Sequence, residues 1–213
     1  MEHFSFIMPS DISTVETTVN KSRFIGVVFP VENQQQVKDA ISSLRKSNKD
    51  AKHIAYAYLL GEDFSLARSN DDGEPAGSAG APIYQAIREK KITNILVAVV
   101  RFFGGVELGK SKLTRVYLNT AANAIANARK VRMVYCNIFE MKCSYGDFGN
   151  LSKSLTEKGF EILDKNYNES MPMIKCAIPE NTSDRVLQDI RVKLKDSAQM
   201  IKVGSEYYRF PIM

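Results

Sequence analysis

The sequence holds 213 residues, of which 44% are hydrophobic and 25% are charged; these shares are ordinary for a globular protein and exclude a disordered or fibrous chain. Its formal net charge is +5, from 29 lysines and arginines against 24 aspartates and glutamates. No stretch approaches about 18 uninterrupted apolar residues, and the start, MEHFSFIMPS, lacks a basic region followed by an apolar core, so we expect neither a membrane span nor a signal peptide.

The first part of the chain alternates between strand and helix patterns. β-branched or alternating runs predict strands at STVETTV (13–19), SRFIGVVFPV (22–31) and HIAYAYLLG (53–61). Between the second and third of these, apolar residues recur at helical spacing behind Asn33, which is a suitable N-cap.

A loop, a short helix and a buried strand follow in the prediction. RSNDDGEPAGSAGAP (68–82) is rich in Gly, Pro, Asn and Asp and predicts a loop, and IYQAIREKK (83–91) predicts a short helix. TNILVAVVRFF (93–103) does not alternate and is rich in Val and Ile, so we expect a strand that is buried on both faces.

From Ser111 the apolar residues recur with the period of an α-helix. One helical face collects Leu113, Val116, Tyr117, Ala121, Ala124, Ile125 and Ala128. Ser111 is the expected N-cap, and a domain boundary is expected near residues 132–137.

The remainder of the chain predicts the element order β-α-β-β-α-β. Four strand-like runs, VYCNIFEMKCS, FEILDKNY, PMIKCAIP and AQMIKVGSEYYRFPI, surround two helical patterns. The first helix is closed by Gly159, and the second is opened by Thr182 or Ser183. This order is that of a ferredoxin-like domain, an antiparallel sheet with both helices on one face.

The three cysteines, Cys136, Cys143 and Cys176, are odd in number and include no CxxC pair. We interpret them as free, mostly buried thiols in a reducing cytoplasm, and we expect neither a disulfide framework nor a metal site.

The basic residues are unevenly distributed. From Asn137 onward eleven Lys and Arg residues stand against eleven Asp and Glu residues, so the whole surplus lies earlier in the chain, 18 against 13. Between Arg101 and Arg132 seven basic residues face one acid, Glu107. Such a stripe suits contact with phosphates or an acidic surface, although a solvated face is the commoner outcome for a basic stretch.

GGVELGKS (104–111) fits the phosphate-binding pattern GxxxxGK[ST] of nucleotide hydrolases. We reject that reading, because those enzymes place the motif after an early strand of a parallel sheet, whereas here about half the chain comes first and an antiparallel domain follows. A glycine turn that leads into a helix N-terminus remains, and it can hold another anion near Lys110, Lys112 and Arg115. The alternative is that these side chains simply extend into water.

Four segments match, in order, the blocks of one protein family. They are KSRFIG (21–26), His53 before an aromatic-containing strand, SNDDGEPAGSAGAP (69–82) and RFFGGVELG (101–109). This set resembles the IMPACT/YigZ family, and the last block resembles its signature. The motif residues are then Asp71, Asp72, Gly73, Glu74, Pro75, Phe102, Phe103, Gly104, Gly105 and Gly109. Bacterial relatives usually continue with further glycines, in the manner of LGTGGLVKAY, where this chain has LGKSKLTRVY. The match to the hydrolase pattern therefore depends on Lys110 and Ser111, two positions at which the family does not have that pattern.

The resemblance implies an α+β chain with two domains. The first, 1–134, would be an Impact N-terminal-like domain similar to the second domain of a small-subunit ribosomal protein and to domain IV of elongation factor G. The second, 135–213, would be the ferredoxin-like domain of the bacterial two-domain branch. Eukaryotic members of the family modulate a translation-initiation kinase pathway, and for bacterial members nucleic-acid or ribosome binding is the usual proposal.

The acidic loop admits two interpretations. Asp71, Asp72 and Glu74 suit either a metal or acid–base site, or a structural loop in which the aspartates bind turn amides and Glu74 pairs with a base; we favour the second. Arg101 closes a buried strand and needs a partner for its charge, so we predict that it contacts one of these three carboxylates.

Three further features complete the candidate residues. His53 is expected to be a hydrogen-bonded structural residue rather than a base or ligand. Only one of Phe102 and Phe103 can point outward from a strand and stack on a base. Lys21 and Arg23 are expected to share a strand face and to extend the basic surface.

We therefore expect a cytoplasmic, non-enzymatic protein that binds RNA or the ribosome, or else a translation-related protein, without catalytic residues, cofactor, metal or membrane contact. The expected polyanion-binding residues are Lys21, Arg23, Arg101, Lys110, Lys112 and Arg115. Two alternatives stay open: an enzyme acting on a phosphorylated small molecule or nucleotide, and a protein-interaction module.

Overall fold

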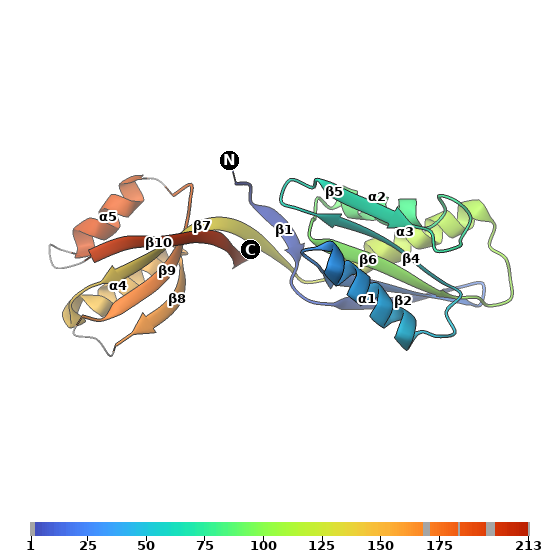
Figure 1. Cartoon of the computed structure of the whole chain (residues 1–213), viewed down its shortest axis with the longest axis horizontal. Coiled ribbons are helices and arrows are strands. Elements are labelled where there is room, and N and C mark those ends of the chain that lie inside the picture. Colours follow the sequence, from blue (N-terminus) through green and yellow to red (C-terminus); the bar gives the residue numbers. More distant parts are fainter. Residues whose placement is uncertain (1–2, 168–170, 183, 195–198, 213) are drawn as a thin grey trace. The chain divides into compact units, whose positions relative to one another are not determined.

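The computed structural model describes residues 3–167, 171–182, 184–194 and 199–212. The chain divides into two compact units, residues 1–132 with 210–213 and residues 133–209 (Figure 1). Both units mix helices with largely antiparallel sheets, so the chain is of the α+β class.

The first unit is built on a five-stranded sheet in which every neighbouring pair is antiparallel. The strand order is β2 (Ser13–Val19), β3 (Ser22–Pro30), β6 (Ile95–Phe102), β4 (His53–Leu60), β5 (Leu66–Asn70). At one end of the central strand, Arg101 pairs in register with Phe24 of β3 and with His53 of β4. Residues far apart in the sequence thus meet at Arg101.

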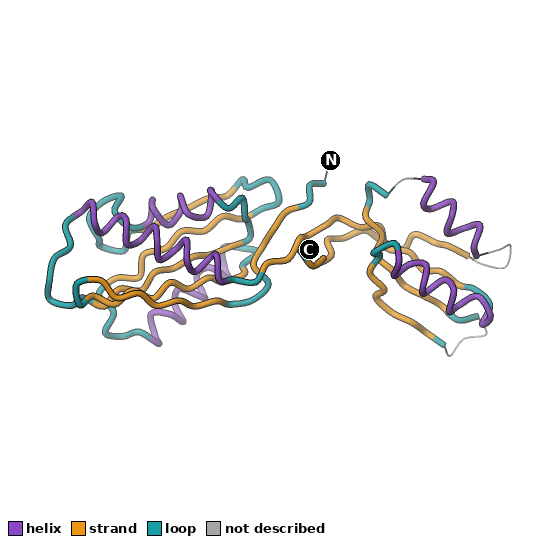
Figure 2. The backbone as a smooth tube through the Cα atoms, turned by 180° about the vertical axis from the view of Figure 1, so that it is seen from behind, coloured by secondary structure: helices purple, strands orange, loops and turns teal. Residues whose placement is uncertain are grey.

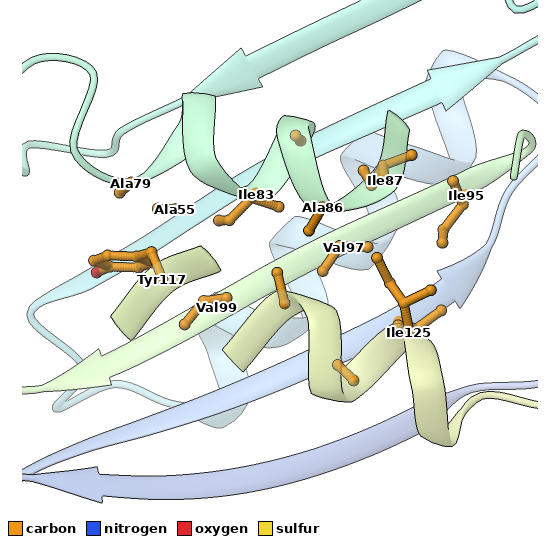
Figure 3. Packing of buried hydrophobic residues seen from close by; sticks show 14 of the residues in the cluster. Ala55, Ala79, Ile83, Ala86, Ile87, Ile95, Val97, Val99, Tyr117 and Ile125 are labelled. Atoms are coloured by element: carbon orange, nitrogen blue, oxygen red, sulfur yellow. The ribbon is translucent and has the colours of Figure 1, made fainter. Parts of the chain in front are cut away.

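Helices cover both faces of this sheet. On one face α2 (Gly80–Glu89) and α3 (Lys110–Asn127) lie side by side (Figure 2) and pack on Ile95, Val97 and Val99 of β6 (Figure 3). On the other face α1 (Gln34–Ser47) packs through Val37, Ile41 and Leu44 against β4 and β6. Residues Ile95 to Arg101 of β6 are all buried, which confirms the strand predicted to be covered on both faces.

Local signals in the sequence explain several element boundaries. The Asn33 side chain accepts a hydrogen bond from the Gln36 N–H and caps α1, as predicted. β1 (Phe6–Pro9) was not predicted, because a run of four residues is too short to show a period. It bridges Ile92 through Ile7 and also pairs with β7, whose first residues belong to the same unit.

Three boundaries differ from the prediction. Residues 68–70 of the expected loop belong to β5, and α2 begins at Gly80 rather than at residue 83, because an upstream carboxylate, described below, accepts its first N–H groups. The N-cap of α3 is Gly109, not Ser111, and Gly109 adopts a φ of +70° that glycine tolerates better than other residues.

The second unit follows the predicted order β-α-β-β-α-β. Its elements are β7 (Lys130–Lys142), α4 (Tyr145–Glu157), β8 (Glu161–Asn166), β9 (Met173–Pro179), α5 (Asp184–Leu194) and β10 (Gln199–Pro211). The sheet runs β8-β9-β7, and β10 pairs with β7. Gly159, with a φ of +75°, ends α4 as predicted, whereas the expected cap Ser183 lies outside the described residues.

The core of the second unit is almost entirely apolar. Phe139 and Met141 of β7, Leu151 and Leu155 of α4 and Ile174 of β9 pack together. The three cysteines are free and buried, and burial raises the pKa of Cys136 and of Cys176 to about 12. Such thiols stay protonated at neutral pH, which fits the structural role expected of them.

Two negative observations concern the described residues only. Among them no group of three or more His, Cys, Asp or Glu side chains is placed to hold a metal ion. In the same part of the chain, none of the helices combines the length and apolar composition needed to cross a membrane.

Candidate functional site

The acidic loop between β5 and α2 is held by its own carboxylates. Asp71 Oδ1 accepts hydrogen bonds from the N–H groups of Ala79 (3.0 Å) and Gly80 (2.8 Å), and Oδ2 accepts one from Gly77 (2.9 Å). Burial alone would raise the pKa of Asp71, but these backbone N–H donors and the charge of Lys110 together hold it below its ordinary value. Asp71 therefore caps α2 from nine residues upstream.

Asp72 ties the loop to two other elements. Its Oδ2 accepts hydrogen bonds from Arg45 Nη2 (2.6 Å) on α1 and from the N–H of Ile54 (2.5 Å) on β4. Its φ of +48° lies in the left-handed region, and Gly73 follows with a φ of +83°. The chain thus turns sharply here and directs Glu74 inward.

Glu74 is the centre of a buried polar cluster. Its side chain is 3% exposed, and both of its carboxylate oxygens accept hydrogen bonds from Arg101 Nη1, at 2.7 and 3.0 Å. The predicted contact between Arg101 and the acidic loop is therefore confirmed. Tyr117 Oη donates a third hydrogen bond to Glu74 Oε1 (2.7 Å), and burial together with the neighbouring carboxylate raises the pKa of Tyr117.

His53 faces this cluster and is held by the acidic loop. Its Nδ1 lies 2.7 Å from the backbone carbonyl oxygen of Asp72, which can only accept, so Nδ1 carries the proton. Its Nε2 lies 3.9 Å from Glu74 Oε2, beyond hydrogen-bonding distance. The expected structural role of His53 agrees with the first contact, and Nε2 is directed toward the cluster.

The second glycine-rich segment packs against the β2–β3 hairpin. The N–H of Gly104 donates to Ser22 Oγ (3.1 Å), and a Cβ at Gly104 would overlap the backbone of Lys21 and Ser22. Glycine is required there because two backbones approach each other directly. Beyond it Gly109 begins α3, which has no side-chain cap.

Together these two segments enclose a cavity of about 410 Å³, here called the loop cavity. Its lining comes from three stretches of the first unit: residues 52–53 at the start of β4, residues 73–75 of the acidic loop, and residues 101–113. Glu74, Arg101 and His53 border it, together with Phe103 and Lys110. The charged cluster is thus the inner part of a hollow that is open to ligands of moderate size.

The six predicted polyanion-binding residues do not form one surface. Lys112 and Arg115 lie about 60° apart around α3, whereas Lys110 lies about 160° from Lys112 and borders the loop cavity. Lys112 Nζ donates to Asn20 Oδ1 (3.1 Å) in the β2–β3 turn, next to Lys21. Lys21, Lys112 and Arg115, all exposed, are here called the hairpin group. Arg23 is exposed but does not belong to it, because its guanidinium lies on the ring of Phe102, on the face of the sheet that α1 covers.

Two expectations about these cations are corrected by the structure. Arg101 is 5% exposed and paired with Glu74, so it is not part of a surface. Lys21 does not share a strand face with Arg23, because Asn20 and Lys21 both have positive φ and form the two-residue turn, and β3 begins at Ser22. Arg23 itself lies 3.6 Å from Glu16.

The two phenylalanines differ in exposure, but not for the predicted reason, because only Phe102 lies on the strand β6. Phe102 is partly buried beneath the guanidinium of Arg23, whose Cζ is 4.2 Å from the ring centroid. Phe103 lies just beyond the end of β6 and is 40% exposed at the loop cavity. Phe103 is therefore the more exposed ring, and Lys52 Nζ lies 4.6 Å from its centroid.

Tyr117, a member of the buried polar cluster, was missed by sequence reasoning. Tyr117 was counted only as part of an apolar helical face, and its ring does pack at right angles on Phe24. The one sequence signal for its contact with Glu74 is a tyrosine on an apolar helical face, because a buried hydroxyl requires a hydrogen-bond partner.

The setting of GGVELGKS differs from that of a nucleotide hydrolase. β6, the strand that leads into it, is antiparallel to both of its neighbours, β3 and β4. A phosphate-binding loop of that class follows a strand of a parallel sheet.

Comparison with known proteins accounts for both glycine-rich segments. The model of the Impact N-terminal domain matches residues 20–125. YvyE of Bacillus subtilis, an IMPACT family member, is 28% identical over 167 residues, covering 78% of this chain and 77% of its own. An IMPACT family member of Haemophilus influenzae is 28% identical over 204 residues, 93% of this chain and 98% of its own. The chain belongs to the IMPACT family.

Two further likenesses extend over most of this IMPACT-family chain. YigZ of Escherichia coli is 27% identical over 180 residues, 82% of this chain and 86% of its own. A crystal structure described as that of a hypothetical protein superposes with a TM-score of 0.62 at 24% identity and covers 94% of this chain and 98% of its own. The second likeness bears on the fold alone.

Proposed function

We propose that this IMPACT-family protein is a non-enzymatic RNA- or ribosome-binding protein that takes part in the regulation of translation in the cytoplasm. The observation that carries the proposal is the hairpin group, three exposed cations brought together by the contact between Lys112 and the β2–β3 turn. Exposed lysines and arginines on one surface match a phosphate backbone, which supplies most of the affinity of non-specific RNA binding.

The α3 N-terminus supports the same proposal. It begins at an exposed glycine turn without a side-chain cap, and no acidic residue stands in its first turn. Free N–H groups and the positive end of the helix dipole favour an anion at this place. Lys110 lies beside it and extends the positive field toward the loop cavity.

The proposal includes the finer fold assignments. We take residues 1–134 as an Impact N-terminal-like domain of the ribosomal-protein and elongation-factor type, and residues 135–213 as a ferredoxin-like domain of the bacterial two-domain branch. The strand order β8-β9-β7 with β10 beside β7 supports the second assignment. Family membership supports the link to translation, because the resemblance implies that eukaryotic members of the family modulate a translation-initiation kinase pathway.

The test is the salt dependence of RNA binding. A fluorescent single-stranded RNA is titrated with the wild-type protein and with Lys112→Ala/Arg115→Ala at several salt concentrations. Loss of two phosphate contacts should lower the affinity about tenfold near 0.1 M salt and reduce the slope of log K against log salt by about 1.4.

A matched control removes the same charge elsewhere in the first unit. Lys38→Ala/Lys46→Ala alters two exposed lysines of α1, on the opposite face of the sheet from α3. We expect less than about a twofold change for this variant. Equal losses for the two variants, or an unchanged salt slope, would show that binding does not depend on the hairpin group.

A further inference from the structure

The loop cavity borders a guanidinium whose hydrogen-bonding capacity is only partly used. Arg101 Nη1 donates to Glu74, but within the described part of the chain Nε and Nη2 have no hydrogen-bond partner, and Nε is fully buried. The Arg101 side chain is 7% exposed. An unmatched buried donor costs about 1–3 kcal/mol. Nη2, the other donor without a partner among the described residues, is not fully buried, and Arg101 lines the cavity, so the guanidinium favours an anionic ligand there.

Several other donors converge on the same cavity. Lys52, just before β4, and Lys110 of α3 line it, and so does Gly109, the residue before the uncapped helix. Phosphate monoesters have three terminal oxygens that accept hydrogen bonds, one more than a carboxylate. The number of donors therefore fits a phosphate group better than a carboxylate.

The charge balance of the lining points the same way. Three cations, Lys52, Arg101 and Lys110, face two carboxylates, Glu74 and Glu107, and Glu74 is already paired with Arg101. Of the acids in the lining, Glu107 is the exposed one left to the lysines, and the charge of Lys110 also acts on Asp71 behind the lining. The lining itself keeps a surplus of one positive charge, which favours an anion.

The rest of the lining is apolar. Pro75, Leu108 and Leu113 contribute to the walls together with the half-exposed ring of Phe103. A cavity of about 410 Å³ is larger than inorganic phosphate requires and suits the organic part of a small ester.

We propose that the loop cavity binds a phosphomonoester, with Lys52, Lys110 and the start of α3 around its phosphate and Phe103 beside its organic part. The ester comes either from a free nucleotide or from the 5′-phosphorylated end of an RNA. This site is separate from the hairpin group, because Lys110 and Lys112 lie on different sides of α3.

Isothermal titration calorimetry with adenosine 5′-monophosphate and adenosine tests the proposal. The monophosphate should bind at least about tenfold more tightly than adenosine, since a charge-assisted hydrogen bond contributes about 1.5–3 kcal/mol. Equal binding of the two compounds, or no binding of the monophosphate at millimolar concentration, would overturn it. Two short RNAs that differ only in a 5′-phosphate or 5′-hydroxyl distinguish the sources: preference for the phosphorylated RNA assigns the site to RNA ends, and its absence with retained monophosphate binding assigns it to free nucleotides.

Variants at exposed positions separate this site from the hairpin group. Lys52→Ala and Lys110→Ala should each weaken monophosphate binding about tenfold, whereas Glu107→Gln should strengthen it, because a negative charge leaves the rim. Lys112→Ala should leave it unchanged. An equal loss in Lys110→Ala and Lys112→Ala would refute the loop cavity as the site. Loss of long-RNA binding in Lys112→Ala/Arg115→Ala with intact monophosphate binding would support both proposals independently.

Discussion

The two units differ in what they bury. Six buried polar or charged residues belong to the first unit: Ser22, Glu74, Ser78, Thr93, Arg101 and Thr120. Among the described residues of the second unit, Ser154 is the only one in that class. Its core is otherwise made of aliphatic and aromatic side chains, methionine and protonated cysteine.

This difference indicates where the molecule is built for binding. A buried ion pair adds little net stability compared with apolar residues of similar volume, because both charges lose their hydration. The Glu74–Arg101 pair nevertheless lies at the one end of the first sheet where both glycine-rich segments meet. We infer that its value lies in shaping the loop cavity, whereas the second unit is optimised for packing.

Among the variants that test this difference between the units, removal of Glu74 should change stability most. Glu74→Ala leaves the Arg101 guanidinium and the Tyr117 hydroxyl buried without their acceptor, so we expect the free energy of unfolding of the first unit to fall by about 3–5 kcal/mol. Urea denaturation followed by circular dichroism measures the loss. Amide hydrogen exchange in β6 and β9 distinguishes the first unit from the second.

The double variant Glu74→Leu/Arg101→Met provides the control. It removes both charges at once, and it should recover more than half of the stability lost in Glu74→Ala. A double variant no more stable than the single one would mean that the pair itself, not the uncompensated charge, sustains the fold.

Glycine substitutions sharpen the comparison with a smaller effect. Gly104→Ala places a methyl group against the backbone of Lys21 and Ser22, and we expect a loss of about 1–3 kcal/mol in the first unit. Gly149→Ala is the matched change in α4 of the second unit, where an added Cβ meets no atom within 4 Å. Alanine favours a helix over glycine, so this variant should gain up to about 1 kcal/mol. Thermal or urea unfolding measures the stability of both variants. Changes of the same sign in the two free energies of unfolding would contradict the interpretation.

The apolar framework of both units could be predicted from the sequence, and the reason is local. The Val- and Ile-rich run of β6 and the helical period of α3 depend only on neighbouring residues. The same is true of Asn33 as N-cap of α1 and of Gly159 at the end of α4. Residues that act within one turn of each other leave a readable pattern.

The candidate site was harder to predict from the sequence, because its contacts join distant segments. The partnership of Arg101 with the acidic loop followed from the need to neutralise a buried charge, yet Tyr117 lies 43 positions from Glu74 and has no local signature. The start of α2 depends on Asp71, nine residues before Gly80. Lys21 was assigned to a strand because the turn Asn20–Lys21 contains no glycine to mark it.

Replacement of Asp71 should change stability least among these variants, and the change should depend on pH. In Asp71→Asn the amide oxygen replaces a carboxylate that accepts from three N–H groups, so the first unit should lose about 1 kcal/mol at neutral pH. The pKa of Asp71 is held below the ordinary value of 3.8, so the stabilisation by its charge is complete well above that value and is lost as the pH falls through the lower, folded-state pKa. The stability difference between wild type and Asp71→Asn should therefore be constant near neutral pH and shrink below about pH 4.

Asp189→Asn, the same change at an exposed position of α5, should alter stability by less than about 0.5 kcal/mol at any pH. A difference for Asp71→Asn that stayed constant down to pH 2, measured by urea denaturation, would mean that the geometry of the cap matters and its charge does not.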